Sequence, residues 1–416
     1  MATPDDPHRF SEVPSRSVNA LGNRIDVIDR IRGLALLGIL VMNVQSYGLF
    51  LYLQPEQVYS IGLDSPQSYI PSQFLSLWLV KGQFYTIYSF LFGLGFYMIM
   101  KNSERKGLQG NRIYKRRLWA LFLFGLFHAF VLWHGDILHK YALLGFTLLY
   151  FNEKSVRSLL KWIGWLLGLS LLFQVLKFVF SAPPVTPPDL EIDPLIMQVM
   201  DTWKNGTFME VMHMQKQGVA FMWITTALNG FSSLVHFEVM FLLGLIAGKL
   251  NVFNRIPEIW KKWKWMVLIS LPFLLVIKGF FAGENLLWEA GDHAYLPWLA
   301  GVAYFVVTPL LTIAYLMLLS RFFYNNHSRI AQWIGNTGRL GLTNYIAQTG
   351  MCMALFYGYS GGLSGTLTHA ESLLVALGIY AFQVVLSTVW LKFRSVGPLE
   401  WLWRCVSYRK GAGRLP

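Results

Sequence analysis

Long apolar segments, separated by short basic segments, dominate the chain. Each apolar segment is continuous and close to the ~20 residues that a helix needs to cross a bilayer. Continuous segments exclude the alternating strands of a membrane barrel, and open sheet edges are not tolerated in hydrocarbon. The pattern predicts an all-α, polytopic integral membrane protein with ten transmembrane helices. They are expected at residues 33–53, 77–100, 118–134, 137–152, 161–181, 235–250, 265–282, 297–320, 335–357 and 373–391.

The positive charges alternate with the predicted spans. Of the 35 Lys and Arg residues, 29 fall in six segments that share one side of the membrane if both termini are cytoplasmic. These segments are 9–32, 101–117, 154–161, 249–264, 321–339 and 392–414. Because cytoplasmic loops carry an excess of Lys and Arg, we predict cytoplasmic N- and C-termini.

This topology divides the chain into three parts. Residues 1–32 form a cytoplasmic N-terminal segment, 33–391 a transmembrane helical domain, and 392–416 a cytoplasmic basic tail. The longest outer loop is 182–234, and its amphipathic part 217–233 is compatible with an interfacial helix, a re-entrant segment or a partial span. The polar N-terminal segment lacks the apolar region of a signal peptide, so the first span is expected to stay in the membrane.

The composition agrees with a surface that faces lipid. The chain is 54% hydrophobic and 14% charged, whereas soluble domains carry about 25% charged residues. The net charge of +13 follows from the basic loops, so we expect no nucleic-acid partner. The two cysteines, Cys352 and Cys405, are too few and too poorly placed for a disulfide framework.

Several polar side chains fall at a similar depth within the predicted spans. A helix rises about 1.5 Å per residue, so Asn43, eleven residues beyond Arg32, lies about 16 Å from the cytoplasmic edge. The same count from the nearest Lys or Arg at the cytoplasmic edge gives a similar depth for four more residues, and the five together form a polar layer. The four are His128, Glu238, His236 and Gln348. A single such residue most often bonds a neighbouring helix. A layer that includes a carboxylate is a candidate site, because ionisable groups at this depth usually mark a cavity.

A second polar group is predicted near the outer surface. His134, Asp136 and His139 belong to the turn between the third and fourth spans, and Lys81 ends the second span. The spacing in the turn is not that of a known metal site, so we expect no metal.

Other motifs have simpler interpretations. Residues 358–362 match the G-x-S-x-G pattern, but a nucleophile elbow requires a preceding strand. We interpret them as an outer loop. Gly93-Leu94-Gly95 lacks the rest of a phosphate loop and indicates close helix packing. The basic segment 101–117 serves the topology, with contact to anionic lipid or a phosphorylated cytosolic ligand as alternatives.

The first span, DRIRGLALLGILVMN at 29–43, resembles the opening of the YeiB family of bacterial inner-membrane proteins. Further similar blocks follow in order: FLFGLGF at 90–96, Arg116-Arg117, His128, WHGDIL at 133–138, GRLGLTNY at 338–345 and GPLEW at 397–401. The resemblance covers nearly the whole chain. It implies a multi-pass protein of the bacterial inner membrane.

The family looks like a distant relative of the membrane-embedded acyltransferases. These enzymes take an acyl group from a cytosolic donor, commonly acetyl-CoA, and place it on a sugar or another acceptor. Many carry an Arg in the first span and a catalytic His eleven residues later. Arg32 matches this Arg, but Asn43 stands at the position of the His. The heparan-glucosaminide acetyltransferases look similar in having Asn there, and draw their His from elsewhere.

The leading hypothesis is therefore acyl transfer to a sugar-like or small hydroxyl or amine acceptor. His128 is the expected base because His exchanges a proton near neutral pH, with His134 as the alternative. Asn43 would donate to the oxyanion or orient the reactants, and Glu238 would hold the imidazole tautomer. Asp136 would lie on the acceptor side together with His134.

The remaining predicted contacts are with substrates and lipid. We expect acyl-CoA as a co-substrate and no tightly bound cofactor. The arginines expected to face the phosphates are Arg32, Arg116, Arg117 and Arg339, and the residues expected to bind the acceptor are His236, Gln348 and Lys81. The alternatives are a transporter or flippase for a small polar or amphipathic solute, and a non-catalytic scaffold for membrane partners.

Overall fold

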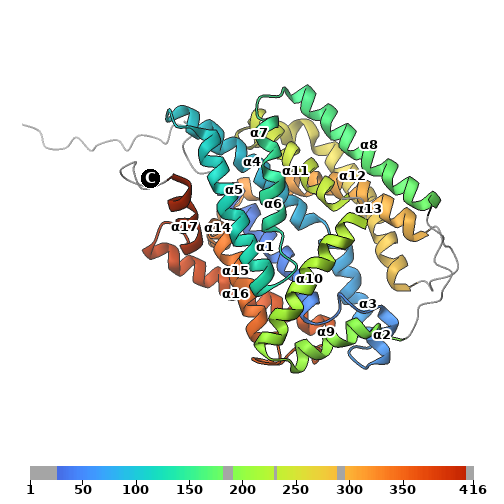
Figure 1. The fold of residues 1–416 in the computed structure, drawn as a ribbon. Helices are drawn as coiled ribbons and strands as arrows, with labels where there is room; N and C mark the ends of the chain where they lie inside the picture. Colours follow the sequence, from blue (N-terminus) through green and yellow to red (C-terminus); the bar gives the residue numbers. More distant parts are fainter. Residues whose placement is uncertain (1–25, 181–190, 229–231, 288–295, 409–416) are drawn as a thin grey trace, which may run out of the picture.

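The computed structural model describes residues 26–180, 191–228, 232–287 and 296–408, which form a bundle of helices (Figure 1). No strand occurs within these ranges. The first half contains α1 (Asp26–Tyr47), α2 (Pro55–Ser60), α3 (Pro66–Leu75), η1 (Ser76–Val80), α4 (Gln83–Arg105), α5 (Gly110–Phe127), η2 (His128–Leu132), α6 (Leu138–Gly145), α7 (Thr147–Phe151), α8 (Val156–Phe180) and α9 (Pro194–Asn205). The second half contains α10 (Phe208–Leu228), α11 (Ser232–Lys249), η3 (Val252–Asn254), α12 (Ile256–Leu287), α13 (Leu296–Asn325), α14 (Arg329–Arg339), α15 (Gly341–Phe356), α16 (His369–Phe393) and α17 (Pro398–Tyr408).

Six of the predicted spans coincide with helices that are long and apolar enough to cross a membrane. These helical stretches, among the described residues, are Pro66–Arg105, Val156–Phe180, Ser232–Lys249, Ile256–Gly283, Leu299–Asn325 and His369–Phe393. The other four predicted spans coincide with helices that are shorter, more polar or interrupted: α1, α5 with η2, α6 with α7, and α14 with α15. The all-helical prediction is thus confirmed, together with six of its membrane-spanning candidates.

Two glycine crossings bring the central helices into close contact. A Cβ atom on Gly93 of α4 would lie 1.9 Å from the carbonyl oxygen of Phe241, and one on Gly244 of α11 would lie 2.0 Å from that of Phe90. The pair Gly33 and Gly338 joins α1 to α14 in the same way. Only glycine allows backbones to approach so closely, and this confirms the packing interpretation of Gly93.

Two of the helical stretches contain a π-helical segment, one between α3 and α4 and one after α5. The π-helical segment η1 leads to Gly82, whose φ of 92° separates it from α4. The π-helical segment η2 extends α5 and ends at Trp133, from where a short turn leads to α6. Such π segments are frequent at functional sites.

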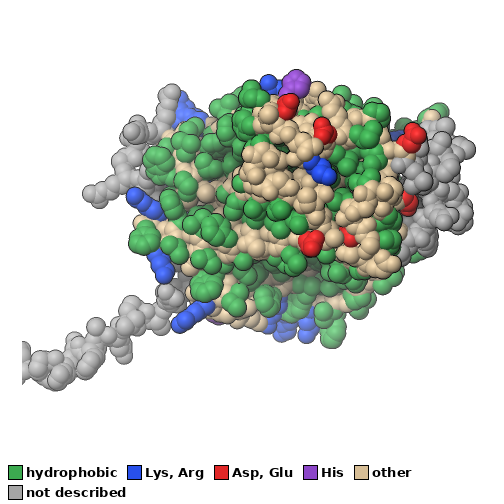
Figure 2. All heavy atoms as spheres, turned by 90° about the horizontal axis from the view of Figure 1, so that it is seen from below, with side chains coloured by type: hydrophobic (Ala, Val, Ile, Leu, Met, Phe, Trp, Pro, Cys, Tyr) green, Lys and Arg blue, Asp and Glu red, His purple; other side chains and the backbone are tan. Residues whose placement is uncertain are grey.

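The outward faces of the bundle are apolar. On α8, Trp165 is 76% exposed and Phe180 is 82% exposed. Figure 2 shows the molecule from below, with apolar side chains interspersed with polar surface, several Asp and Glu side chains, and most of the visible Lys and Arg at the margin. The exposed apolar side chains of α8 are typical of a surface in contact with lipid rather than water.

The outer loop predicted at 182–234 contains two helices, α9 and α10. Helix α10 begins at Phe208, before the amphipathic stretch predicted at 217–233, because Thr207 and Glu210 satisfy backbone groups at its start. Val211 and Val219 are buried, and α10 packs against η2. The Pro-rich start of the loop lies outside the described residues.

Candidate functional site

A cavity of about 260 Å³ lies among α1, α4, α5, α6, α15 and α17. We call it the arginine cavity. Its polar lining side chains are Arg32, Arg117, Arg339, Arg404, Glu400, Tyr88, Tyr114, Tyr141 and Tyr345. Three of the four arginines predicted to face phosphates therefore line one cavity, although they belong to distant parts of the chain.

The arginine side chains are held in place by neighbouring groups. Arg32 Nη1 lies 3.1 Å from Asp29 Oδ1. The guanidinium of Arg117 stacks 3.9 Å above the ring of Trp403, whose indole N–H donates to the Arg117 carbonyl at 2.8 Å. A stacked guanidinium keeps its N–H groups available in a fixed orientation.

Glu400 contributes a carboxylate to the cavity but is already engaged. Its Oε1 accepts from the backbone N–H groups of Leu342 and Thr343 at 2.7 and 3.0 Å, and its Oε2 accepts from the Thr343 hydroxyl at 2.6 Å. This carboxylate therefore caps the first turn of α15. The four guanidinium groups outnumber the two nearby carboxylates, those of Asp29 and Glu400. The part of the cavity that the arginines line, which we call the arginine end, therefore carries excess positive charge.

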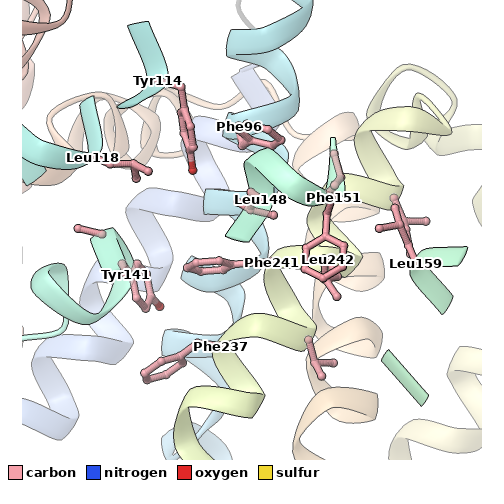
Figure 3. Close-up of a cluster of buried hydrophobic side chains, with 14 of the residues drawn as sticks. Phe96, Tyr114, Leu118, Tyr141, Leu148, Phe151, Leu159, Phe237, Phe241 and Leu242 are labelled. Atoms are coloured by element: carbon pink, nitrogen blue, oxygen red, sulfur yellow. The ribbon is translucent and has the colours of Figure 1, made fainter. Parts of the chain in front are cut away.

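The rest of the cavity is walled by aromatic and aliphatic side chains. Figure 3 shows Phe96, Tyr114 and Tyr141 in the apolar cluster that forms part of this wall. The hydroxyl groups of Tyr88 and Tyr114 are buried without a hydrogen-bond partner among the described residues. Gly95 also lines the cavity, and a Cβ atom there would meet nothing within 4 Å. The cavity thus combines cations at one end with an apolar body and two available hydroxyl groups.

A buried histidine cluster lies at the turn between η2 and α6. His139 Nδ1 and Asp136 Oδ2 are 2.6 Å apart, and the His139 backbone N–H donates to the same oxygen at 2.9 Å. His128 Nδ1 lies 2.9 Å from Asp136 Oδ1, although the angles there are not those of a regular hydrogen bond. On the opposite edge of its ring, His128 Nε2 is 2.8 Å from the hydroxyl oxygen of Thr349.

The surroundings of Asp136 decide its protonation. Burial opposes ionisation, but the nearby ring of His128 and the hydrogen bonds from His139 outweigh it and hold the pKa of Asp136 below its usual value. Asp136 is therefore a carboxylate at neutral pH. A carboxylate facing Nδ1 favours the proton on that nitrogen, which leaves Nε2 of His128 to accept from Thr349. This is the order of groups, hydroxyl to imidazole to carboxylate, found in catalytic triads.

Tyr345 connects the two features. Its side chain lines the arginine cavity, and its ring lies 5.1 Å from that of His128, centroid to centroid. Ile137 and Leu138, which follow Asp136, line the same cavity. His128 itself is 0% exposed, so the cavity ends one aromatic ring away from the histidine cluster.

The structure brings only part of the predicted polar layer together. His128 and Asp136 are in contact, whereas Glu238 of α11 bonds Thr147 at 2.7 Å. The expected orientation of His128 by Glu238 is therefore wrong: Asp136 occupies that place, because the turn after η2 folds it back onto the ring.

The other predicted residues occupy separate helix interfaces. His236 bonds the Phe305 carbonyl at 2.9 Å, and Gln348 donates to Gln383 at 2.9 Å. His134 Nδ1 lies 2.7 Å from Gln215 Oε1, and its Nε2 lies 3.3 Å from the Tyr52 hydroxyl. These contacts are the interhelical bonds that isolated polar residues usually make.

Three further predicted residues lie apart from the histidine cluster. Asn43 is half-buried on α1 and is not among the described residues that line the arginine cavity. Arg116 lines a separate surface depression, and Lys81 lines a second cavity. Among the described residues, no group of three His, Cys, Asp or Glu side chains has the arrangement of a metal site.

Sequence reasoning did not assign a role to Thr349, His139, Tyr345 or Arg404. Thr349 gave no signal, because a hydroxyl within an apolar helix is common and its partner lies 221 residues away. Tyr345 belongs to the GRLGLTNY block, and Arg404 to the basic tail that was interpreted only as topology.

Comparison with known proteins gives relatives without an assigned activity. Residues 247–410 match a family described as "Protein of unknown function (DUF418)". The chain is 29% identical over 400 residues to "Uncharacterized protein YxaH" of Bacillus subtilis (strain 168), covering 92% of this chain and 94% of the relative. It is 26% identical over 402 residues to "Uncharacterized protein YeiB" of Escherichia coli (strain K12), covering 92% and 96%.

A third relative is the "Uncharacterized 39.9 kDa protein in amylase 3'region" of Bacillus acidopullulyticus, which is 27% identical over 391 residues, with 94% of this chain and 96% of the relative covered. No solved structure matches the chain significantly. The resemblance to YeiB is confirmed over most of the length. The matched family region includes Tyr345, Thr349 and Arg404, whereas His128 and Asp136 lie outside it.

Proposed function

We propose that the chain is a membrane-embedded acyltransferase that moves an acyl group from an acyl-CoA to a hydroxyl or amine acceptor at or across the membrane. The observation that carries this proposal is the arginine cavity, which ends one aromatic ring from a buried hydroxyl, imidazole and carboxylate. Cations for a phosphorylated donor and a base for its acceptor are thus adjacent.

We further infer ten transmembrane helices with both termini on the cytoplasmic side of a bacterial inner membrane. The distribution of Lys and Arg supports this topology. The arginine end of the cavity would then open toward the cytosol, where acyl-CoA is found. Labelling of single cysteines in the loops at 106–109 and 357–368 tests the topology, because only the second loop should react from outside intact cells.

The donor would bind with its phosphates at the arginine end. A guanidinium group can donate two hydrogen bonds to the oxygens of one phosphate, and the four arginines of the cavity belong to four different helices. The volume of about 260 Å³ is below the range of roughly 300–1,000 Å³ that encloses a whole drug-sized ligand. The cavity would therefore hold the acyl-pantetheine arm, with the nucleotide outside.

The chemistry would proceed through His128. Its Nε2 takes the proton from the acceptor hydroxyl or amine, whose oxygen or nitrogen attacks the thioester carbonyl. The C–S bond breaks, and the thiolate leaves with the proton that the imidazolium returns. Asp136 holds the ring and stabilises its charged form. Since His128 is fully buried, Tyr345 has to swing aside before reactants reach it.

The test is the release of free thiol from acetyl-CoA by the purified protein in lipid nanodiscs. We expect His128→Ala to lower the rate by about 100-fold or more. His236→Ala is the matched control, because His236 is also buried but bonds the Phe305 carbonyl and not a carboxylate among the described residues. Equal rates for the two variants, with both proteins folded, contradict the assignment of the base. Absence of acetyl-CoA binding by the wild type contradicts the donor.

A transporter is the second candidate, and the two π-helical segments support it. Interrupted helices that line a cavity are typical of transporters, and η2 carries His128 at its start. Uptake of a solute into vesicles that depends on His128, without any covalent product, favours this function over acyl transfer.

A further inference from the structure

A second cavity, of about 350 Å³, lies between η1 and the neighbouring helices α12 and α13. We call it the lysine cavity. Its lining residues are Leu77, Lys81, Ile277, Lys278, Phe281, Ala282, Ala300, Gly301, Ala303, Tyr304, Val307 and Thr308. It shares no residue with the arginine cavity, and its two ammonium groups stand in an otherwise largely apolar lining.

Lys278 is held in a fixed orientation. Its side chain is buried, and its ammonium donates to the Lys81 carbonyl at 2.7 Å and to Gln83 Oε1. An ammonium has three protons, so one is left to face the cavity. Lys81, an exposed residue, lines the same space. Among the described residues, neither ammonium has a carboxylate within ion-pair distance.

The junction at Gly82 places Lys81 beside α13. Gly82 has a φ of 92°, and a Cβ atom there would lie 2.7 Å from the Tyr304 hydroxyl. Tyr304 in turn lies 2.9 Å from the Tyr85 hydroxyl. Thr308 also lines the cavity, and its hydroxyl group is buried without a hydrogen-bond partner among the described residues. The polar groups of the cavity are therefore donors supplied by rigid elements.

The walls indicate what kind of anion fits. Small residues on α13, Ala300, Gly301 and Ala303, leave the volume open. The adjoining outer faces are apolar: Phe273 is 66% exposed, Val276 71% and Val306 48%. Cations in apolar surroundings are costly unless an anion compensates them. A free anion would meet no favourable partner on these faces, whereas a hydrocarbon chain would.

We propose that the lysine cavity binds the anionic oxygen group of a lipid, a phosphate or a carboxylate, whose hydrocarbon chain lies along α12 and α13. Lys81 and Lys278 neutralise the headgroup, and the Thr308 hydroxyl donates to it. This site goes beyond the proposed acyl transfer and does not depend on it.

The experiment measures the thermal unfolding midpoint of the purified full-length protein in detergent with increasing phosphatidylglycerol. A ligand that binds only the folded state raises this midpoint as its concentration rises. We expect the wild type to be stabilised, and Lys81→Met to need at least tenfold more lipid for the same shift. Lys81→Met is the informative variant, because the Lys81 ammonium has no hydrogen bond or ion pair with the described residues that the fold would lose. Lys216→Met, at an exposed lysine of α10, is the control and should behave as wild type.

Three results overturn the proposal. The first is an equal response of Lys81→Met and the wild type. The second is an equal effect of phosphatidylcholine, which removes the requirement for net negative charge. The third is an equal shift with inorganic phosphate, which assigns the cavity to a soluble anion. Ala303→Leu, which fills the cavity and keeps both lysines, should also abolish the response to phosphatidylglycerol.

Discussion

The arginine cavity and the lysine cavity both place cations beside apolar walls, yet the cations are held in different ways. Arg117 is stacked on Trp403, and Arg32 is paired with Asp29. Lys278 is held by a carbonyl and an amide oxygen, and no described carboxylate lies near it. The first cavity continues to a buried imidazole, whereas the second adjoins the exposed apolar faces of α12 and α13.

This difference shows that positive charge at a membrane cavity does not by itself indicate one kind of ligand. Guanidinium groups in a planar, stacked arrangement suit multiple phosphate oxygens on a soluble donor. Ammonium groups are compact point charges that suit a single headgroup. Only the arginine cavity has groups capable of chemistry nearby, so the two sites should respond independently to substitution.

The largest expected effect is that of Asp136→Asn. Removing the carboxylate takes away the group that orients His128, and we expect thiol release from acetyl-CoA to fall by about 100-fold or more. Stabilisation by phosphatidylglycerol should be unchanged. Glu238→Gln is the control, since this buried acid bonds Thr147 instead of His128. Similar losses in the two variants would remove the distinction between the histidine cluster and other buried polar groups.

Gly95→Leu should reduce the volume of the arginine cavity and leave the lysine cavity unchanged. No atom lies within 4 Å of a Cβ at Gly95, so the new side chain enters the arginine cavity without disturbing the helix contact. We expect acetyl-CoA binding, measured by calorimetry, to weaken by more than about tenfold, or roughly 1.4 kcal/mol. Gly168→Leu on α8 meets equally open space but lines neither cavity. Normal binding by Gly95→Leu would exclude this cavity as the donor site.

Arg117→Lys should show whether the stacked guanidinium matters beyond its charge. Lysine keeps the charge but loses the planar fork, so we expect about tenfold weaker acetyl-CoA binding. The adjacent Arg116→Lys lies in a different surface depression and should change binding by less than about twofold. If both substitutions have the same effect, the arginines act only through net charge, as the lysines do.

The smallest expected effect is that of Glu400→Gln. The carboxylate caps α15, so its loss should lower the free energy of unfolding by about 1 kcal/mol. Thermal unfolding in nanodiscs measures this change. Glu104→Gln, at an exposed pair with Lys101, should have almost none. A larger effect on acetyl-CoA binding than on stability would mean that Glu400 contacts the donor.

The sequence predicted three of the four arginines of the arginine cavity, but not the partner of His128. Arg32, Arg117 and Arg339 were expected at one site and do line one cavity. His128 was singled out by depth, but depth could not tell which helix face it occupies. Glu238 lies at a similar predicted depth and is nevertheless bonded to another helix. Axial position follows from residue number and helix rise, whereas the direction of a side chain depends on the rotation of each packed helix.

The chain by itself determined its helical class, its apolar spans and the close approach at Gly93, because these depend on local composition and on the absence of a side chain. The tertiary structure alone decided which polar groups meet. Thr349 reaches His128 across 221 residues, Lys278 reaches the Lys81 carbonyl across 197, and Trp403 reaches Arg117 across 286. Such pairs are selected by the packing of whole helices against one another, and no local pattern of residues records the outcome.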